Sequence, residues 1–578
     1  TATNVYNTAV GMNAGKAVTT AVQNTLIGGQ VGDALTQGAR NTAVGYVALS
    51  SDTLGQYSTA VGYAALFSSN QTTAVNTYNV AVGYAAGEAV TTGIRNTLIG
   101  GLAGDALTDA DYNVAMGLGA LGSDTLGSNN TAIGSFALGN QNFTTATASY
   151  NVAVGYDAGV SVTTGIRNTL LGSEAGDALT DADDNVAIGA LALSGDTLGS
   201  RNTAVGRGAL KVQNFTTATE SYNTAVGYSS GESISTGASN TLIGGLAGDA
   251  ITTGASNVAV GVNSLGSNQA GSNSVAIGNG ALFTQVGSGN RFNIGIGADA
   301  GYAVTTGEQS TFVGSLAGDA ITTGNINVAL GYAALSTATI NSANVAIGGQ
   351  ALLNMNNTTT ANTFNTAVGY NAGVAVTTGV QNTLIGGQAG DNITTGGENT
   401  IVGYDIAANA VGAVRQVLIG SNFTAGGDNA VRIGTSVGLA TLALDGSDTS
   451  WAATSDERLK KDITDSTVGL SFINALRPVT FKWNAKNAIA DTLPQYDADS
   501  SDPVYGEGKA HHGFIAQEIK AVIDANSDVV DGHNIWAEDP DGTQQVAPSA
   551  LVPMLVKAIQ EQSALITALT DRITALEG

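Results

Sequence analysis

A short motif that recurs at nearly constant spacing constrains the fold of this chain more than any other feature. The motif reads Asn-Thr/Val-Ala/Leu-Val/Ile-Gly and first occurs at Asn7–Gly11. Its final glycines fall at 11, 28, 45, 62 and 83, so the spacings are 17, 17, 17 and 21 residues. This quartet recurs as far as Gly403, with a super-period of 72 residues that shortens once to 70. Fixed short periods predict a solenoid in which each coil stacks on the next.

The composition of each unit favours strands over helices. A unit is too short for a helix-turn-helix, its Gly, Asn and Thr suit turns, and its Ala-Val and Leu-Ile pairs suit strands. Neighbouring strand residues point to opposite faces, so Ala9 and Val10 lie on different sides, and we expect both sides to be buried. One side would fill the coil. The other needs a partner, and because small alanines suit close approach, we expect them to meet neighbouring chains around a trimer axis.

One copy of the motif also carries a family resemblance. The stretch Asn273-Ser274-Val275-Ala276-Ile277-Gly278 resembles the head repeats of trimeric, YadA-like autotransporter adhesins. Those heads are left-handed parallel β-rolls in homotrimers, although the unit here is longer than usual for them. The resemblance implies a mainly β, homotrimeric parallel β-roll of 17-residue coils. A monomeric β-helix is the alternative.

Charge and composition exclude several classes of partner. The net charge is −25, which argues against nucleic acid, because affinity for nucleic acid needs Lys and Arg to neutralise phosphates. There is no Cys, so no disulfide or thiolate-metal framework is possible, and we predict no metal and no cofactor. The absence of a run of about 18 apolar residues predicts no membrane insertion. All six prolines lie beyond residue 450, and since proline removes ladder donors, the first domain boundary is expected there.

An aspartate follows each strand of the Asn-Thr-Leu-Ile type, in the segment Ala/Val-Gly-Asp. A ladder of such carboxylates suggests cation binding, but members four coils apart cannot share an ion. We therefore interpret them as Asx-type turn residues that accept hydrogen bonds from backbone N–H groups. They are Asp33, Asp105, Asp177, Asp249, Asp319 and Asp391.

The longer units carry extra loop residues rich in Asn, Gln and Thr, with aromatic residues among them. Loops on a rigid scaffold often hold binding sites, and amides and hydroxyls beside aromatic faces suit sugars. The candidate glycan-binding residues are Phe143, Tyr150, Phe215, Tyr222 and Phe292. The alternative is that these are spacer loops whose aromatics turn back onto the roll. No carboxylate pair recurs in them, so no glycosidase site is evident.

Three regions follow from these patterns: a fibre region over residues 1–403, a tapering β neck over 404–454, and an α+β domain over 455–578. In the last region we expect a strand through Val479–Trp483 and a helix from about Gly513 to Ala525. Apolar spacing of 3 and 4 residues then predicts a coiled-coil helix over about residues 549–577. Its seam consists of Val552, Leu555, Ile559, Gln562, Ile566, Leu569, Ile573 and Leu576.

The stretch SDERLKKDI, residues 455–463, places Ser455 five residues before Lys460. A lysine whose pKa is lowered by desolvation can take the proton of a serine hydroxyl, so such a pair can make serine nucleophilic without histidine. His511 and His512 are alternative proton acceptors. On spacing alone, an exposed basic linker is the plain alternative.

Four blocks occur in order: SDERLKKDI (455–463), LRPVTFKW (476–483), HHGFIAQE (511–518) and the terminal heptad helix. Together they resemble the intramolecular chaperone auto-processing domain of bacteriophage tailspikes and tail fibres, over about residues 455–578. In that family the domain helps a trimeric β-fibre to assemble and then cuts itself off at the motif serine. The resemblance implies that Ser455 is the nucleophile, Lys460 its base and Thr454–Ser455 the scissile bond. It also makes His512 and Glu518 candidate supporting groups.

The predicted function is therefore that of a phage tail fibre, made in the host cytoplasm and carried on the virion. It would be a homotrimeric adhesin for a bacterial surface glycan or other receptor, joined to a tail or baseplate protein through an upstream N-terminal segment. Its chaperone would act once per chain as a serine-type endopeptidase. The alternatives are a tailspike depolymerase that cleaves a surface polysaccharide and a non-phage trimeric surface adhesin.

Overall fold

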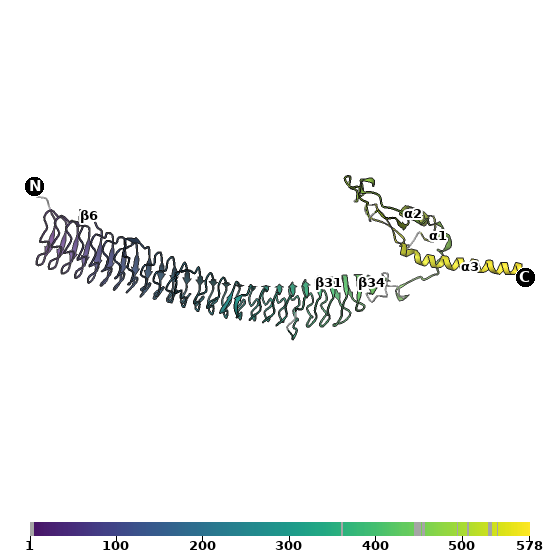
Figure 1. Ribbon diagram of the computed structural model, residues 1–578, viewed down its shortest axis with the longest axis horizontal. Coiled ribbons are helices and arrows are strands. Elements are labelled where there is room, and N and C mark those ends of the chain that lie inside the picture. The colour runs from purple at the N-terminus through teal and green to yellow at the C-terminus, as the bar shows by residue number, and fades with distance from the viewer. Residues whose placement is uncertain are drawn as a thin grey trace. The chain divides into compact units, whose positions relative to one another are not determined.

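The chain forms two compact units, residues 1–454 and residues 455–578. The structure is a computed structural model that describes residues 5–359, 362–443, 452–453, 457–493, 495–505, 508–529, 534–539 and 542–578. The first unit is a parallel β-solenoid, and the second mixes short strands with helices (Figure 1). The molecule is therefore mainly β, as the repeat predicts.

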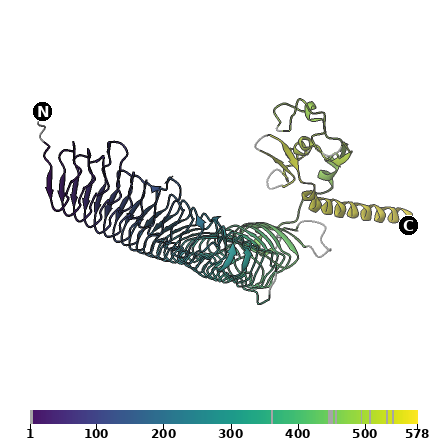
Figure 2. The same ribbon diagram turned by 60° about the vertical axis from the view of Figure 1, so that its left-hand side comes forward.

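In the described part of the chain, a 27-stranded sheet runs along one side of the solenoid: each coil contributes one strand, and two antiparallel strands follow at the C-terminal end. Each motif pairs in register with the next one, as in Thr8↔Thr25, Ala9↔Leu26 and Val10↔Ile27. The strands of successive coils therefore lie parallel and side by side (Figure 2). The predicted stacking of 17-residue coils is confirmed.

The strands of this sheet are β1 Thr8–Val10, β2 Thr25–Ile27, β3 Thr42–Val44, β5 Thr59–Val61, β7 Val80–Val82, β8 Thr97–Ile99, β9 Val114–Met116, β11 Thr131–Ile133, β13 Val152–Val154, β14 Thr169–Leu171, β15 Val186–Ile188, β17 Thr203–Val205, β19 Thr224–Val226, β20 Thr241–Ile243, β21 Val258–Val260, β23 Val275–Ile277, β25 Ile294–Ile296, β26 Thr311–Val313, β27 Val328–Leu330, β28 Val345–Ile347, β29 Thr366–Val368, β30 Thr383–Ile385, β31 Thr400–Ala407, β32 Val417–Thr424, β33 Ala430–Thr435, β34 Gly438–Ala443 and β35 Ala452–Ala453. Four further parallel pairs lie beside the long coils: β4 Gly55–Gln56 with β6 Val75–Asn76, β10 Gly127–Ser128 with β12 Thr147–Ala148, β16 Gly199–Ser200 with β18 Thr219–Glu220, and β22 Ala270–Ser272 with β24 Ser288–Asn290.

The glycine that ends each motif allows the coils to stack closely. Gly100 has a φ of +137°, and a Cβ there would lie 2.4 Å from the carbonyl oxygen of Gly117 in the next coil. A side chain would thus strain the backbone and also collide with the neighbouring coil. This is the physical reason for the strict recurrence of glycine.

Buried asparagines connect each coil to the next. The backbone N–H of Asn96 donates to Oδ1 of Asn79 at 2.9 Å, and Nδ2 of Asn96 donates to the carbonyl oxygen of Ala110 at 2.7 Å. Both asparagine side chains are fully buried. Because buried polar groups must be hydrogen-bonded, these contacts satisfy backbone groups at the coil corner that no strand reaches.

The alanines of the motif point into the coil, which corrects the expectation that they meet neighbouring chains. Ala81, Leu98 and Ala115 are fully buried inside the solenoid. Leu107 fills the same interior from the turn on the opposite side of the coil, so a small strand residue suffices there. The other side of the strand, which carries Ile99 and its equivalents, faces outward.

The region predicted as a neck continues the solenoid. Strand β31 crosses the expected boundary at residue 403, and β32 and β33 extend the parallel ladder beyond it. Strand β34 then pairs antiparallel with β33, and β35 pairs antiparallel with β34. A hairpin needs only a short turn, whereas a parallel neighbour needs a full crossover, so the switch to antiparallel pairing ends the stack.

The second unit has a small hydrophobic core of its own. Its elements are η1 Glu457–Leu459, α1 Leu470–Ala475, β36 Val479–Phe481, η2 Lys486–Ala488, β37 His511–Gly513, α2 Ala516–Asp524, β38 Trp536–Glu538, β39 Gln544–Val546, η3 Pro548–Leu551 and α3 Val552–Glu577. β36 pairs antiparallel with β37, and β38 with β39. The core includes Phe472 from α1, Ile519 and Ile523 from α2, and Leu551. The predicted strand and both predicted helices are confirmed, with slightly shorter bounds.

No helix in the described part of the chain is long and apolar enough to cross a membrane.

Candidate functional site

The processing site predicted from the sequence begins outside the described residues, which include neither Thr454 nor Ser455. The described part starts with the single turn η1, after which the backbone N–H of Lys460 donates to the carbonyl oxygen of Glu457 at 3.0 Å. Lys460 therefore lies directly after this helical turn. Its position relative to Ser455 stays a prediction.

The segment around Lys460 is exposed in the single chain. Residues 457–467 are all exposed, and the apolar side chain of Leu459 is 75% exposed. The buried core of the second unit begins only at Val468. A lysine base needs a desolvated amine, and this core does not provide the desolvation. Burial of Lys460 therefore requires a covering surface from elsewhere.

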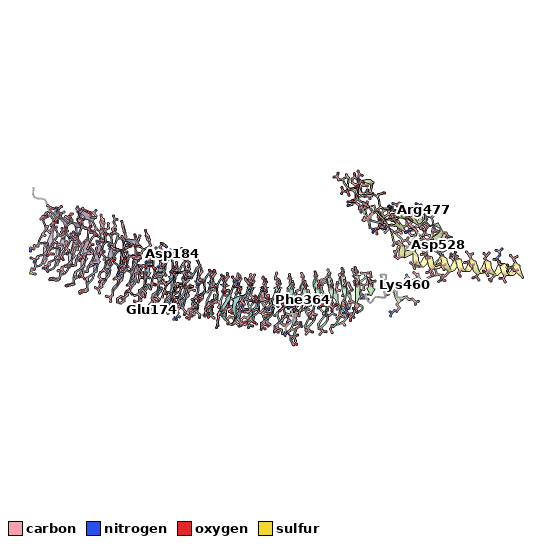
Figure 3. All side chains as sticks on the ribbon, in the orientation of Figure 1. Glu174, Asp184, Phe364, Lys460, Arg477 and Asp528 are labelled. Carbon is pink, nitrogen blue, oxygen red and sulfur yellow. The ribbon has the colours of Figure 1, made fainter. Side chains whose placement is uncertain are left out.

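The two candidate supporting groups have other partners. Nδ1 of His512 lies 3.2 Å from Oγ1 of Thr480, across the β36–β37 pair. Glu518 accepts a hydrogen bond from Nε of Arg477 at 2.9 Å and a second one from Nη2. These bonds to the Arg477 side chain hold the pKa of Glu518 below its usual value. Figure 3 shows Arg477 well separated from Lys460, so Glu518 serves as an anchor for α2 rather than as a base beside Lys460.

His511 is a candidate that the sequence reasoning underrated. It is more buried than its neighbour His512, and its ring lies 5.8 Å from that of Phe481 between centroids. Its Nε2 is buried and has no hydrogen-bond partner among the residues that the structure describes. Strand alternation was the available signal, because only one of two successive histidines can face the interior.

The comparison with protein families bears on this same segment. Residues 455–528 match the family described as chaperone of endosialidase. The match contains Lys460, His511, His512 and Glu518, and it starts at the first residue of the second unit. No curated protein and no solved structure matches the chain. The chain thus combines a β-solenoid with a C-terminal segment that is similar to this chaperone family.

Beyond the chaperone-like segment, α3 carries the predicted apolar seam, which is largely uncovered in the described part of the chain. Seven of its eight residues are large hydrophobics, and all seven are exposed in the single chain: Val552, Leu555, Ile559, Ile566, Leu569, Ile573 and Leu576. An apolar pocket of about 300 Å³ adjoins the start of this seam and is lined by Ile473, Phe514, Leu551 and Leu555 among others. Exposed apolar surface of this extent marks a protein interaction site.

Two of the five candidate glycan-binding residues, Phe143 and Phe215, are buried in the single chain. Phe143 is 6% exposed and Phe215 is 7% exposed. The backbone N–H of Phe143 donates to Oδ1 of the buried Asp124, and Oγ1 of Thr125 donates to the carbonyl oxygen of Phe143. The extra loop residues thus turn back onto the solenoid at these two positions, as the spacer alternative predicts.

The other three predicted residues, Tyr150, Tyr222 and Phe292, are half-exposed. Tyr222 is held in place, since its hydroxyl donates to Glu220 and accepts from Nη1 of Arg201 at 2.6 Å. The Arg201 guanidinium also lies over the Tyr222 ring. Tyr150 and Phe292 remain as surface aromatics beside the coil corner.

The recurring aspartates lie in partly buried turns. Burial raises the pKa of Asp105, Asp249, Asp319 and Asp391, and their carboxylates also interact with N–H groups of their own turns. Burial, with further contributions from Glu174 and Asp157, raises the pKa of Asp177 to about 6. Among the residues that the structure describes, no group of three or more His, Cys, Asp or Glu side chains is placed to hold a metal ion.

We expect Asp177→Asn to stabilise the solenoid at neutral pH. A pKa raised from 3.8 to about 6 means that the folded state holds its proton more tightly, so this site favours folding at low pH and opposes it as the pH rises through 6. After a discount for solvent screening, the gain at pH 7.5 should be about 1 kcal/mol. Thermal melting at pH 4 and pH 7.5 measures it.

Asp184→Asn is the matched control, and we expect it to change the stability of the solenoid in the opposite direction. Hydrogen bonds from Arg167 hold the pKa of Asp184 below its usual value, so its ionised form favours folding. Figure 3 shows Asp184 and Glu174 at opposite edges of the solenoid, so the two sites are separate. An Asp177→Asn variant that melts lower than wild type at pH 7.5 would contradict the prediction.

Proposed function

We propose that this chain is a homotrimeric bacteriophage tail fibre that binds a bacterial surface, and that its C-terminal unit is an intramolecular chaperone. The observation that carries the proposal is the position of the chaperone match. It begins at Ser455, directly after the unit that contains the solenoid. A long ladder of parallel strands folds slowly and exposes strand edges, so a template at its C-terminal end meets a physical need.

Two apolar surfaces support association of three copies. The outward side of the solenoid strands carries Val, Ile, Leu or Met in every coil from Val10 to Ile433. Each coil adds about 4.8 Å to the length of the column, so the column is on the order of 100 Å long. If another copy covers a face of this length, the buried area exceeds what a stable interface requires. Only a surface with the same repeat can match it in register, and another copy of this chain has that repeat. The α3 seam would join the same copies at the C-terminus.

The chemistry of release follows from the predicted Ser-Lys pair. Oγ of Ser455 attacks the carbonyl carbon of Thr454, and the neutral amine of Lys460 takes the hydroxyl proton. The C–N bond then breaks, the proton passes to the departing amine of Ser455, and an ester joins the two residues. Water hydrolyses this ester, which leaves a carboxylate on Thr454 and restores the hydroxyl of Ser455. Each chain is cut once.

Burial of Lys460 would couple this cut to assembly. Its segment is exposed in one chain, and the apolar side chains of Leu459 and Ile463 flank it. Packing of this segment against neighbouring copies would desolvate the amine and favour its neutral form. Cleavage would then follow trimer formation and leave a fibre that cannot easily refold, and so is kinetically stable.

In this proposal the fibre is made in the host cytoplasm and carried on the virion, where an upstream N-terminal segment joins it to a tail or baseplate protein. The half-exposed Tyr150 and Phe292 belong to the surface that meets the host. The receptor would be a glycan of the bacterial surface.

Intact mass of purified wild type beside Ser455→Ala tests the proposal. We expect wild type to give two fragments that meet between Thr454 and Ser455, and the variant to stay whole. Ser466→Ala is the matched control and should be cut like wild type, since in the described part of the chain the Ser466 hydroxyl hydrogen-bonds only to the backbone of Val468. A wild-type trimer that stays uncut would contradict self-cleavage and would mean that the C-terminal unit remains attached to the fibre.

A further inference from the structure

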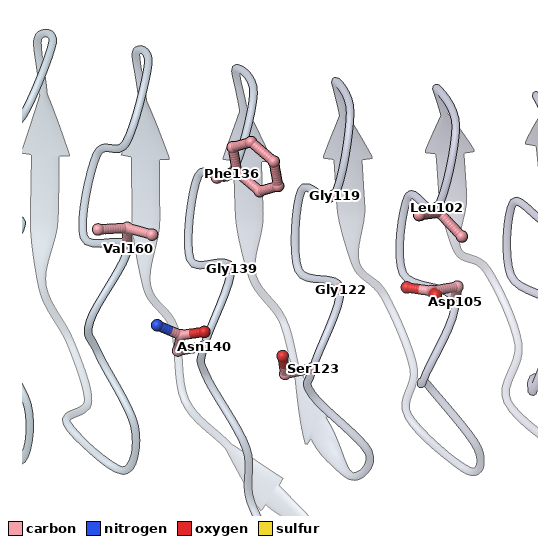
Figure 4. A pocket seen from close by; sticks show the side chains of 9 residues that line it. All are labelled: Leu102, Asp105, Gly119, Gly122, Ser123, Phe136, Gly139, Asn140 and Val160. Atoms are coloured by element: carbon pink, nitrogen blue, oxygen red, sulfur yellow. The ribbon is translucent and has the colours of Figure 1, made fainter.

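A surface pocket crosses four successive coils of the solenoid. It has a volume of about 230 Å³, and Leu102, Asp105, Ser123, Phe136, Asn140 and Val160 line it together with three glycines. Figure 4 shows these residues on the turns that follow the strands, so the pocket lies away from the outward side of the strands. It uses none of the aromatic residues singled out by the sequence.

Glycines create the space. A Cβ on Gly119 would lie 2.8 Å from Cδ1 of Phe136, so the bare backbone of one coil lets the ring of the next coil lie over it. A Cβ on Gly122 would lie 3.3 Å from Oδ1 of Asp105, so the carboxylate rests against a second bare position. A side chain at either glycine would occupy the pocket or displace its walls.

The repeat provides an internal comparison for this pocket. Positions 72 residues before and after Gly119 hold Val47 and Leu191, and the same shift from Gly139 leads to Phe67 and Lys211. The backbone is the same at these sites, with φ of 54° at Val47, 61° at Gly119 and 60° at Leu191. The neighbouring super-repeats therefore fill the space that this one leaves open.

The lining has the composition of a sugar site. Phe136 offers an exposed aromatic face, on which the C–H side of a pyranose ring can rest. The Asp105 carboxylate can accept hydrogen bonds from adjacent hydroxyls, and the Asn140 amide can both donate and accept. The side chains of Asn140 and Ser123 have no hydrogen-bond partner in the described part of the chain. Their polar groups are thus free to bind a ligand.

We propose that this pocket binds a neutral hexose segment of a glycan chain, with Phe136 as the platform and Asp105 and Asn140 as hydrogen-bonding partners for hydroxyls. This inference rests on the proposed receptor-binding function and names its site. Four coils extend about 14 Å from first to last, which accommodates two or three sugar units.

Charge selects against acidic sugars. Burial raises the pKa of Asp105, and the negative charge of Glu88 in the preceding coil adds to the shift. A carboxylate in this environment gains from hydroxyl donors and repels an anion. The net charge of −25 opposes an anionic glycan at longer range. A sialic acid oligomer is therefore excluded as the ligand of this pocket.

The test is titration of the full chain with three probes: maltotriose as a neutral hexose oligomer, chitotriose, and an α2,8-linked sialic acid trimer. We expect wild type to bind maltotriose with a dissociation constant between about 0.1 and 5 mM, as small shallow sites do, and not to bind the sialic acid trimer. Phe136→Ala should weaken binding at least tenfold. Its fold should persist, because Ala64 occupies the equivalent position with a φ of 55° against 56° for Phe136.

Two further variants sharpen the test. Gly119→Asn should also abolish binding by filling the pocket, and Asn263 shows that asparagine adopts this backbone conformation two super-repeats later. Phe67→Ala removes another partly exposed aromatic from the same turn surface outside the pocket and should leave binding unchanged. Absence of maltotriose binding to wild type, preference for chitotriose or the sialic acid trimer, or full binding by Phe136→Ala would each overturn the inference. If the same sample is cut at Ser455, the proposed function survives that failure.

Discussion

Replacement of Lys460 by alanine is expected to leave every chain uncut, whereas replacement of its neighbour Lys461 should leave cleavage at the wild-type rate. In the proposed mechanism Lys460 is the only proton acceptor for the Ser455 hydroxyl, and loss of a positioned base costs about 10²- to 10⁴-fold in rate. Lys461 lies 3.8 Å from the adjacent Asp462 and both side chains are largely exposed, so its ion pair contributes little. Intact mass measured at intervals after purification gives the fraction cut for each variant.

Histidine variants separate a lysine base from a histidine base. If Lys460 acts, His511→Ala and His512→Ala should both be cut like wild type. If His511 or His512 acts instead, Lys460→Ala will still be cut and a histidine variant will not. That result would move the base to the β36–β37 pair, which contains both histidines.

Ile243→Asp is expected to convert the fibre from a trimer into single chains. Ile243 lies at the end of β20 on the outward side of the strand, between Val226 and Val260 of the adjacent coils. In the proposed trimer, three carboxylates would be buried in one apolar column, and each unpaired buried charge costs several kcal/mol. Sedimentation equilibrium of the purified variant, whether or not it has been cut, reports the mass directly.

Val212→Asp is the matched control for this prediction. Val212 is 51% exposed in the single chain and Ile243 is 40% exposed, so simple surface hydrophobicity would favour the larger effect at Val212. Val212 follows Lys211 in an extra-long coil, on the turns rather than on the outward side of a strand. We expect Val212→Asp to remain trimeric. A trimeric Ile243→Asp fibre with unchanged melting would place the interface on another side of the coil.

The two predictions are linked through the exposure of the Lys460 segment. If burial of Lys460 depends on neighbouring copies, a variant that cannot form trimers should also be cut slowly. Cleavage measured in Ile243→Asp therefore tests the coupling. Rapid cutting of single chains would show that the C-terminal unit desolvates its own lysine.

Much of the fold could be predicted from the sequence, because the residues that determine it are local and periodic. A glycine after each strand and an asparagine before it specify the coil, since only glycine tolerates the φ of +137° at Gly100 and the close carbonyl of Gly117. The 3-and-4 spacing specified α3, and the change in proline usage near residue 450 matched the division between the two units. These features need no knowledge of distant contacts.

The sequence alone did not predict which side of each strand faces the interior of the coil. Alternation shows that Ala9 and Val10 oppose each other, but it does not say which of them the coil encloses. The answer depends on Leu107 and its equivalents, which enter the same space from the turn across the coil. The expectation for alanine was wrong for this reason, and the outward column of Val and Ile appeared only in three dimensions.

The candidate sites divide in the same way. The sequence by itself determined the repeat, the motif around Ser455 and Lys460, and the apolar seam, because each is a pattern along the chain. Only the tertiary structure decided that Phe143 and Phe215 are buried, that Glu518 is bound to Arg477, and that a pocket opens beside Phe136. Those outcomes depend on contacts between residues that are distant in the sequence. Stacking of the coils creates such contacts in the solenoid, and packing of the helices creates them in the second unit. Chain order does not reveal them, because a missing side chain at Gly119 matters only once the ring of Phe136 lies over it.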